Sequence, residues 1–162
     1  MDDLASMSGP AAELLKSRRQ TIAVAESSAG GLISAALLAQ PGASAYFRGG
    51  GVIYTAAARA AFLPDPGPSP GWERAATEPY ALWLARTLRA HLGADWGLAE
   101  TGAAGPAGNR YGDPAGHSCI AVAGAIERAL TIETGHGRRE ENMHAFAAAA
   151  LALLAEALGA RG

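Results

Sequence analysis

The segment 21–32 carries the residues whose types and spacing point most clearly to chemistry. A strand-like run of Thr, Ile, Val and Ala ends near Ser27 and Ser28, and two glycines then lead into an apolar helical pattern. A serine hydroxyl beside unpaired backbone amides has the arrangement that acyl transfer needs, with Ser27 as nucleophile and the amides holding the oxyanion. Serine and glycine are also ordinary residues at a helix start. On these residues alone, Ser27 is either a nucleophile or part of a helix cap.

A second candidate group follows in the segment 52–63. Tyr54 ends a short strand predicted over 52–55, and Arg59 lies in a short helix predicted over 56–63. An arginine beside a phenol stabilises the phenolate, which could then act as general base towards a serine. The arginine could instead clamp a carboxylate or phosphate through two donors. Tyr54 could equally be an aromatic lid on the core.

A third candidate group lies at the end of a strand predicted over 96–101. The glycine-rich loop 102–108 exposes several backbone amides there, but it has neither the Walker lysine nor the G-x-G-x-x-G spacing. A single phosphate held by amide donors fits this loop better than a triphosphate or a dinucleotide. Glu100 is a carboxylate in an apolar strand end, so it needs a hydrogen-bonding partner or an open pocket.

Strands that alternate with helices must position these groups. Helices are predicted over 10–19 with Pro10 at the start, over 30–39 and 56–63, from Thr77 to about 92, and from about Arg139 onward. Strands are predicted over 21–25, 52–55, 96–101, 118–123 and 129–134, and the last two form an antiparallel pair. This order predicts an α/β protein, a three-layer α/β/α sandwich with a mostly parallel sheet and one antiparallel strand. The segments 27–31, 54–59 and 101–108 should then meet at the carboxyl ends of the strands, where such sheets bind ligands.

Length and composition limit the possible functions. The 162 residues predict a single domain over 1–162 with its core at about 11–158. A net charge of −2 without a basic block argues against nucleic-acid and membrane partners. The lone Cys119 fits a reducing compartment and an inert, buried thiol, and the absence of a signal-type segment predicts a cytoplasmic protein. The four histidines have no metal-ligand spacing, so we expect no metal. An exposed sheet edge and alanine-rich helices are consistent with a homo-oligomer.

Five motifs, in order, resemble the CinA C-terminal domain family, whose stand-alone members are nicotinamide-nucleotide amidases. The family pattern A-E-S-C-T-G-G is similar to residues 25–31, and the pattern P-G-S-S…F-x-x-G-x-V-x-Y is similar to 41–54. The patterns T-G-I-A-G-P, P-V-G-T-V and G-D-R-E-E resemble 101–106, 114–118 and 137–141. The resemblance covers about 11–158 and implies a sheet topology like that of anticodon-binding domains.

The resemblance implies an amidohydrolase that converts nicotinamide mononucleotide into nicotinate mononucleotide and ammonia, with no metal and no cofactor. The nucleophile would be Ser27, assisted by Tyr54, and Arg59 occupies the position of the family lysine. The substrate-binding residues would be Glu26, Ser28, Gly30, Gly31, Thr101, Gly102, Ala104, Gly105 and Arg139.

The departures from the family pattern gather around the same candidate site. Arg59 replaces an amine that can lose its proton with a guanidinium that cannot. Ala56 replaces the motif asparagine, Glu100 stands at a valine-like position, and Ser28 replaces the cysteine after the nucleophile. These changes predict either a weakened amidase or a catalytically silent protein that binds a pyridine nucleotide or a protein partner as a sensor. A flavin-binding domain is a third possibility, but no aromatic residues are placed to sandwich a flavin.

Overall fold

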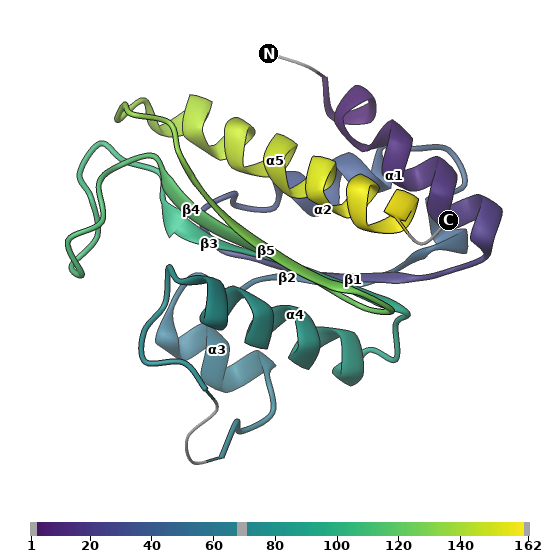
Figure 1. The fold of residues 1–162 in the computed structure, drawn as a ribbon, viewed down its shortest axis with the longest axis horizontal. Coiled ribbons are helices and arrows are strands. Elements are labelled where there is room, and N and C mark those ends of the chain that lie inside the picture. The colour runs from purple at the N-terminus through teal and green to yellow at the C-terminus, as the bar shows by residue number, and fades with distance from the viewer. Residues whose placement is uncertain (1–2, 68–70, 161–162) are drawn as a thin grey trace.

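The computed structural model describes residues 3–67 and 71–160, which form one five-stranded sheet between two layers of helices (Figure 1). The strand order is β2-β1-β3-β4-β5. Strands β2, β1 and β3 are parallel, whereas β4 is antiparallel to both β3 and β5. One strand therefore runs opposite to the other four, as predicted. The strands are β1 (Ile22–Glu26), β2 (Phe47–Val52), β3 (Trp96–Ala103), β4 (His117–Ala123) and β5 (Glu127–Glu133).

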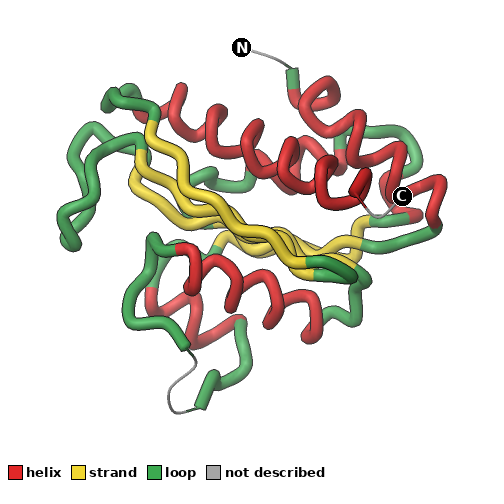
Figure 2. The backbone as a smooth tube through the Cα atoms, in the orientation of Figure 1, coloured by secondary structure: helices red, strands yellow, loops and turns green. Residues whose placement is uncertain are grey.

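The helices cover both faces of the sheet, which confirms the three-layer sandwich (Figures 1 and 2). One face carries α1, α2 and α5, and the opposite side carries α3 and α4. A short 3-10 turn, η1, precedes β2. The bounds are α1 (Leu4–Arg18), α2 (Leu32–Leu38), η1 (Ala43–Ala45), α3 (Ala56–Phe62), α4 (Glu78–His91) and α5 (Arg139–Ala160).

Each face of the sheet has its own apolar core. Val24, Ile120 and Phe146 are fully buried between the sheet and the α1/α2/α5 layer, whereas the α4 side is lined mostly by small residues. Helix α4 approaches β3 so closely that a Cβ on Gly97 would overlap the carbonyl oxygen of Ala85. Every residue of β1 is buried, as expected for a central strand covered on both sides.

Most elements differ from their predicted bounds by one or two residues, and two differ by more. Helix α1 begins at Leu4 because the Asp3 carboxylate caps it by accepting the Ser6 N–H at 2.7 Å, so Pro10 lies inside the helix rather than at its start. Strand β2 covers the three glycines and ends at Val52, before the predicted 52–55. Glycine is required there because a Cβ on Gly50 would overlap the Ser34 hydroxyl. The predicted loop 64–71 lies partly outside the described residues.

Helix α5 is long and apolar enough to cross a membrane by length and composition alone. One such helix is weak evidence for a membrane span, because the core helix of a soluble domain passes the same test of length and composition. Here Phe146, Ala150 and Leu154 of α5 are fully buried against the sheet and its neighbouring helices. The burial of this face is what a core helix requires.

Candidate functional site

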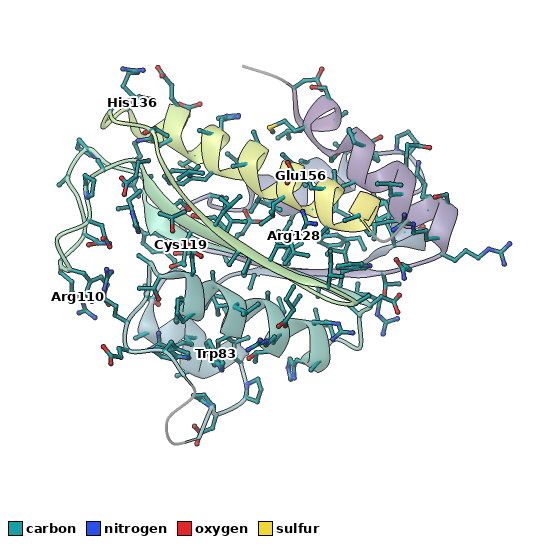
Figure 3. All side chains as sticks on the ribbon, viewed as in Figure 1. Trp83, Arg110, Cys119, Arg128, His136 and Glu156 are labelled. Atoms are coloured by element: carbon teal, nitrogen blue, oxygen red, sulfur yellow. The ribbon has the colours of Figure 1, made fainter. Side chains whose placement is uncertain are left out.

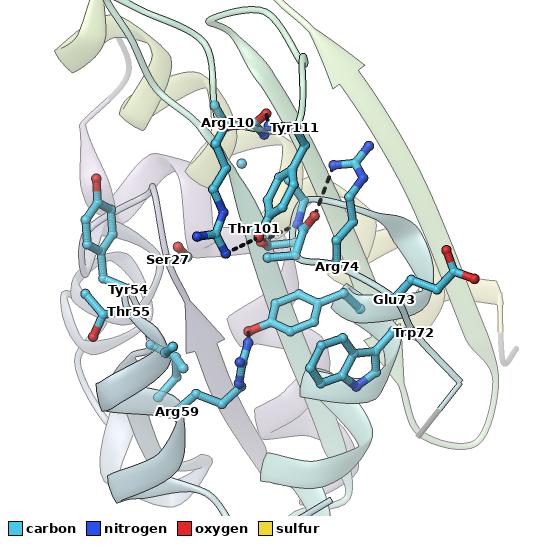
Figure 4. Close-up of a pocket in the computed structure, with 17 residues that line it drawn as sticks. Ser27, Tyr54, Thr55, Arg59, Trp72, Glu73, Arg74, Thr101, Arg110 and Tyr111 are labelled. Carbon is cyan, nitrogen blue, oxygen red and sulfur yellow. Dashed lines mark hydrogen bonds between the residues drawn. The ribbon is translucent and has the colours of Figure 1, made fainter. Parts of the chain in front are cut away.

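A cavity of about 470 Å³ opens where β1, β2 and β3 end (Figure 4). Ser27, Tyr54, Arg59, Thr101 and Gly102 line it, so residues from the three predicted segments meet at this edge of the sheet. Its volume is in the usual range for small-molecule sites. Two further segments, 72–76 and 109–111, complete the wall.

The turn that carries Ser27 is tied to the neighbouring strand β3 by Glu100. The Glu100 carboxylate accepts the N–H of Ser27 at 3.0 Å and the N–H of Ala29 at 2.8 Å. It also accepts the hydroxyl of Ser28 and, at 3.0 Å, that of Ser118. The Ser27 hydroxyl itself has no hydrogen-bonding partner within residues 3–67 and 71–160, and Ser27 lines the cavity.

A second buried carboxylate, Glu26, holds the other half of the turn. It accepts the N–H groups of Gly31, Ile33 and Ser34 at 2.8, 3.1 and 2.9 Å. Glu26 was expected both to anchor the turn through backbone amides, which these hydrogen bonds confirm, and to bind substrate, but it does not line the cavity.

Most backbone amides of this turn are therefore already used. The Gly30 N–H donates to the Ser27 carbonyl at 3.0 Å, and the Gly31 N–H donates to Glu26, so neither amide is free for an oxyanion. Over residues 27–34, Ser28 alone has a backbone N–H without an acceptor in the described part of the chain. The oxyanion was expected to bind amides near Gly30 and Gly31 or in the loop 102–105, and within the described residues of 27–34 the Ser28 N–H is the one amide still available.

Glu100 is fully buried and forms no ion pair with any described lysine, arginine or histidine. Burial raises the pKa of Glu100, and its four hydrogen-bond donors offset only part of that rise. The sequence required a partner or a pocket for this carboxylate, and the structure provides the turn of the candidate nucleophile as the partner.

The expected pairing of Arg59 with Tyr54 is corrected by the structure. The guanidinium of Arg139 donates to the Tyr54 oxygen at 3.2 Å and also to the Gly105 carbonyl. The guanidinium of Arg59 instead donates to the Tyr80 oxygen at 3.2 Å, and Figure 4 shows the Tyr54 oxygen pointing away from Arg59. The cation beside the candidate base therefore comes from α5, 85 residues along the chain.

Arg59 is part of an aromatic wall. Its guanidinium lies 5.0 Å from the Trp72 ring centroid and 5.7 Å from that of Tyr80, within the range of cation–π contacts. The Trp72 and Tyr80 rings meet edge to face at 4.9 Å. The indole N–H of Trp72 is buried without a partner among the residues that the structure describes. This wall offers apolar rings and one positive charge to a ligand.

The opposite wall is built around Tyr111. Arg74 and Arg110 lie at 4.9 and 5.0 Å from its ring centroid, and Arg110 donates to its oxygen at 3.0 Å. Arg74 also binds both oxygens of Asp113, at 2.7 and 3.3 Å, and this contact holds the pKa of Asp113 below its usual value. Figure 3 shows Arg110 on the outer loop, and its side chain is exposed.

His117 does not line the cavity, but it contacts Ala76 and Asp113, which hold the residues of this wall. Its Nδ1 lies 2.7 Å from Glu133, and its Nε2 lies 2.9 Å from the carbonyl of Ala76 and 3.7 Å from Asp113. Burial disfavours the imidazolium, but Glu133, Ala76 and Asp113 outweigh it and raise the pKa of His117. Cys119 beside it is buried, as expected, and burial raises the pKa of its thiol.

Several residues expected to bind substrate lie off the cavity. The carbonyls of Ala104 and Gly105 accept from Asn142 and Arg139, so this part of the loop is fastened to α5. The residues that do not line the cavity are Glu26, Gly30, Gly31, Ala104, Gly105, Arg139 and also Ser28, whose hydroxyl donates to Glu100 while its backbone N–H stays unengaged in the described residues.

Sequence reasoning missed the segments 72–76 and 109–111 and Tyr80. The one available signal was the run of aromatic and arginine residues directly after the proline-rich loop. In the described ranges, no group of three His, Cys, Asp or Glu residues could hold a metal ion.

Comparison with known proteins relates this chain to CinA proteins by both a family model and individual relatives. A family model described as the CinA C-terminal domain matches residues 4–158. A CinA-like protein of Synechococcus sp. (strain CC9902) is 40% identical over 78% of this chain, and one of Gloeobacter violaceus is 42% identical over 85%. The matched parts are only 30% and 32% of those relatives, so the chain spans about a third of the length of the curated relatives that it matches.

Solved structures extend the similarity to the whole fold. The competence damage-inducible protein A (ComA) of Klebsiella pneumoniae superposes with a TM-score of 0.88 at 27% identity, covering 98% of each chain. The competence/damage inducible protein CihA of Agrobacterium tumefaciens superposes with a TM-score of 0.86 at 27% identity, covering 98% of this chain and 97% of its own.

Proposed function

The chain belongs to the CinA C-terminal domain family, and from this premise we propose that it is a serine amidohydrolase of nicotinamide mononucleotide. The products are nicotinate mononucleotide and ammonia. One observation carries the proposal: Ser27 lies on the cavity with a hydroxyl free of hydrogen bonds in the described part of the chain, while two buried carboxylates fix its turn. A nucleophile needs a fixed backbone and an accessible oxygen.

In the proposed reaction the Ser27 oxygen attacks the carboxamide carbon and its proton passes to the oxygen of Tyr54, which takes part as the phenolate with Arg139 as its hydrogen-bond donor. The backbone N–H of Ser28 stabilises the developing oxyanion, in the position that follows a nucleophile on a sharp strand-to-helix turn. The C–N bond breaks, and ammonia leaves with the proton from Tyr54. Water then hydrolyses the acyl-enzyme, which releases the carboxylate and restores the Ser27 hydroxyl.

The cavity fits the two ends of this substrate. Arg59 and Arg110 supply positive charge for a phosphate, and guanidinium groups bind phosphate through paired donors. Trp72, Tyr80 and Tyr111 present apolar surface for an aromatic ring. Arg74 contributes less charge because Asp113 neutralises it.

A catalytically silent binder of a pyridine nucleotide is the second candidate, and the contacts of Arg59 favour it. This guanidinium is engaged by Tyr80 and Trp72 and cannot accept a proton. Such a protein would bind the substrate in the same cavity without cleaving it.

Ammonia release from nicotinamide mononucleotide separates the two candidates. The amidase predicts turnover that Ser27→Ala abolishes and that the matched exposed-serine control Ser44→Ala retains. The silent binder predicts no turnover in the parent, a ligand-induced rise in Tm, and turnover gained by Arg59→Lys. Absence of both turnover and a Tm shift would reject both candidates for this substrate.

A further inference from the structure

We propose that Glu100 is a positioning residue for Ser27, which acts by accepting hydrogen bonds rather than by moving a proton. The inference rests on the proposed function, because positioning has a kinetic meaning only for a reacting serine. Glu100 is fully buried near the end of β3, and its carboxylate is hydrogen-bonded to the turn that carries Ser27.

The two oxygens of Glu100 have different partners. Oε2 accepts the backbone N–H groups of Ser27 and Ala29, and Oε1 accepts the hydroxyls of Ser28 and Ser118. A carboxylate has about four acceptor sites, so all of them are filled. The backbone N–H groups can only donate, which makes an acceptor obligatory at Oε2, whereas the hydroxyls at Oε1 can donate or accept.

This arrangement sets the turn around the nucleophile. With the amides of Ser27 and Ala29 both committed to Glu100, the intervening Ser28 N–H is left without an acceptor in residues 3–67 and 71–160. Glu100 comes from β3 and Ser27 follows β1, so the contact also fixes the nucleophile relative to Thr101, the next residue on β3 and part of the cavity wall.

A proton relay through the Ser28 hydroxyl is the competing role for Glu100. Two substitutions separate positioning from proton transfer. Glu100→Gln keeps the length and can turn its oxygen to the two N–H groups while its NH₂ donates to the hydroxyls, but it cannot take a proton. Glu100→Asp keeps the charge and basicity but withdraws the carboxylate by one methylene, so it cannot reach both N–H groups.

Steady-state hydrolysis of nicotinamide mononucleotide by these variants tests the proposal. Positioning predicts that Glu100→Gln stays within about fivefold of the parent kcat, while Glu100→Asp loses about a hundredfold, the usual scale for a misplaced oxyanion donor. KM should change little in either variant, because Glu100 does not line the cavity. A Glu100→Asp variant that is faster than Glu100→Gln would overturn the proposal. Glu156→Gln makes the same chemical change on the exposed face of α5 and should leave kcat unchanged, so it serves as the control.

Amide hydrogen exchange makes the test independent of turnover. Protection of the Ser27 and Ala29 amides should be equal in the parent and Glu100→Gln and at least tenfold lower in Glu100→Asp. Equal protection in all three proteins would overturn the positioning role. A parent without turnover but with this exchange pattern would reject the proposed amidase and keep Glu100 as the residue that fixes the turn.

Discussion

Replacing Asn142 by alanine should destabilise the protein more than any surface substitution on α5. Asn142 is fully buried, and its amide donates to the carbonyls of Ala104 and His136 at 2.7 and 2.8 Å. Its oxygen accepts the Thr134 hydroxyl at 2.6 Å. One side chain thus joins the loop after β3, the end of the β4–β5 hairpin and the first turn of α5.

The size of the effect follows from these contacts. Leaving the buried Ala104 carbonyl without a donor costs roughly 1–3 kcal/mol of stability, and losing the hydrogen bond to the partly exposed His136 carbonyl costs about 0.5–1.5 kcal/mol. The Thr134 hydroxyl can rotate towards another acceptor. The free energy of unfolding should therefore fall by about 1.5–4.5 kcal/mol, which lowers Tm by roughly 3–18 °C for a domain of this size.

Thermal unfolding followed by circular dichroism measures this difference. Glu156→Ala is the control on the exposed face of the same helix and should stay within about 0.5 kcal/mol of the parent. A drop of less than about 2 °C for Asn142→Ala would refute the reasoning, since it would mean that water replaces these hydrogen bonds without loss.

Three further predictions concern buried groups. Because burial raises the pKa of Glu100, its charged form opposes folding above the unfolded pKa of about 4.3, so Glu100→Gln should raise Tm at pH 7, with the difference shrinking towards pH 4. Because the pKa of His117 is raised in the folded protein, its protonation stabilises the fold. This contribution is fully present below about pH 6.5, the unfolded pKa, and is lost as the pH rises through the pKa of the folded protein. A Tm–pH curve unchanged by His117→Gln would contradict this. Gly97→Ala should lose about 3 kcal/mol or more in urea unfolding because of the Ala85 carbonyl, whereas the unobstructed helical control Gly159→Ala should not destabilise.

Most of the fold could be predicted because hydrophobic periodicity and turn residues dominate it. The strand before Ser27, the helix capped by Thr77 and the final antiparallel pair have strong local signals. Strand β2 was misplaced because its glycines normally mark turns. The need of Gly50 for space beside Ser34 is a tertiary contact that no local pattern contains.

The site was most predictable where residues lie near the carboxyl end of a strand. Ser27 directly follows β1, Tyr54 lies two residues after β2 and Thr101 lies near the end of β3, and all three line the cavity. The contact of Arg139 with Tyr54 depends on how α5 packs across the sheet, so sequence neighbours suggested Arg59 instead. The role of Glu100 was equally hidden, because a carboxylate in an apolar strand gives no indication of which segment supplies its donors.

The two carboxylates that hold the serine turn have a consequence for how such a protein can evolve. Neither Glu26 nor Glu100 touches the cavity, and the residues that surround a ligand come largely from loops outside the buried scaffold. Substitutions on those loops can alter which molecule enters the cavity without moving the Ser27 oxygen. Descendants of this chain can therefore change their ligand one rim residue at a time while inheriting the same geometry of the serine turn.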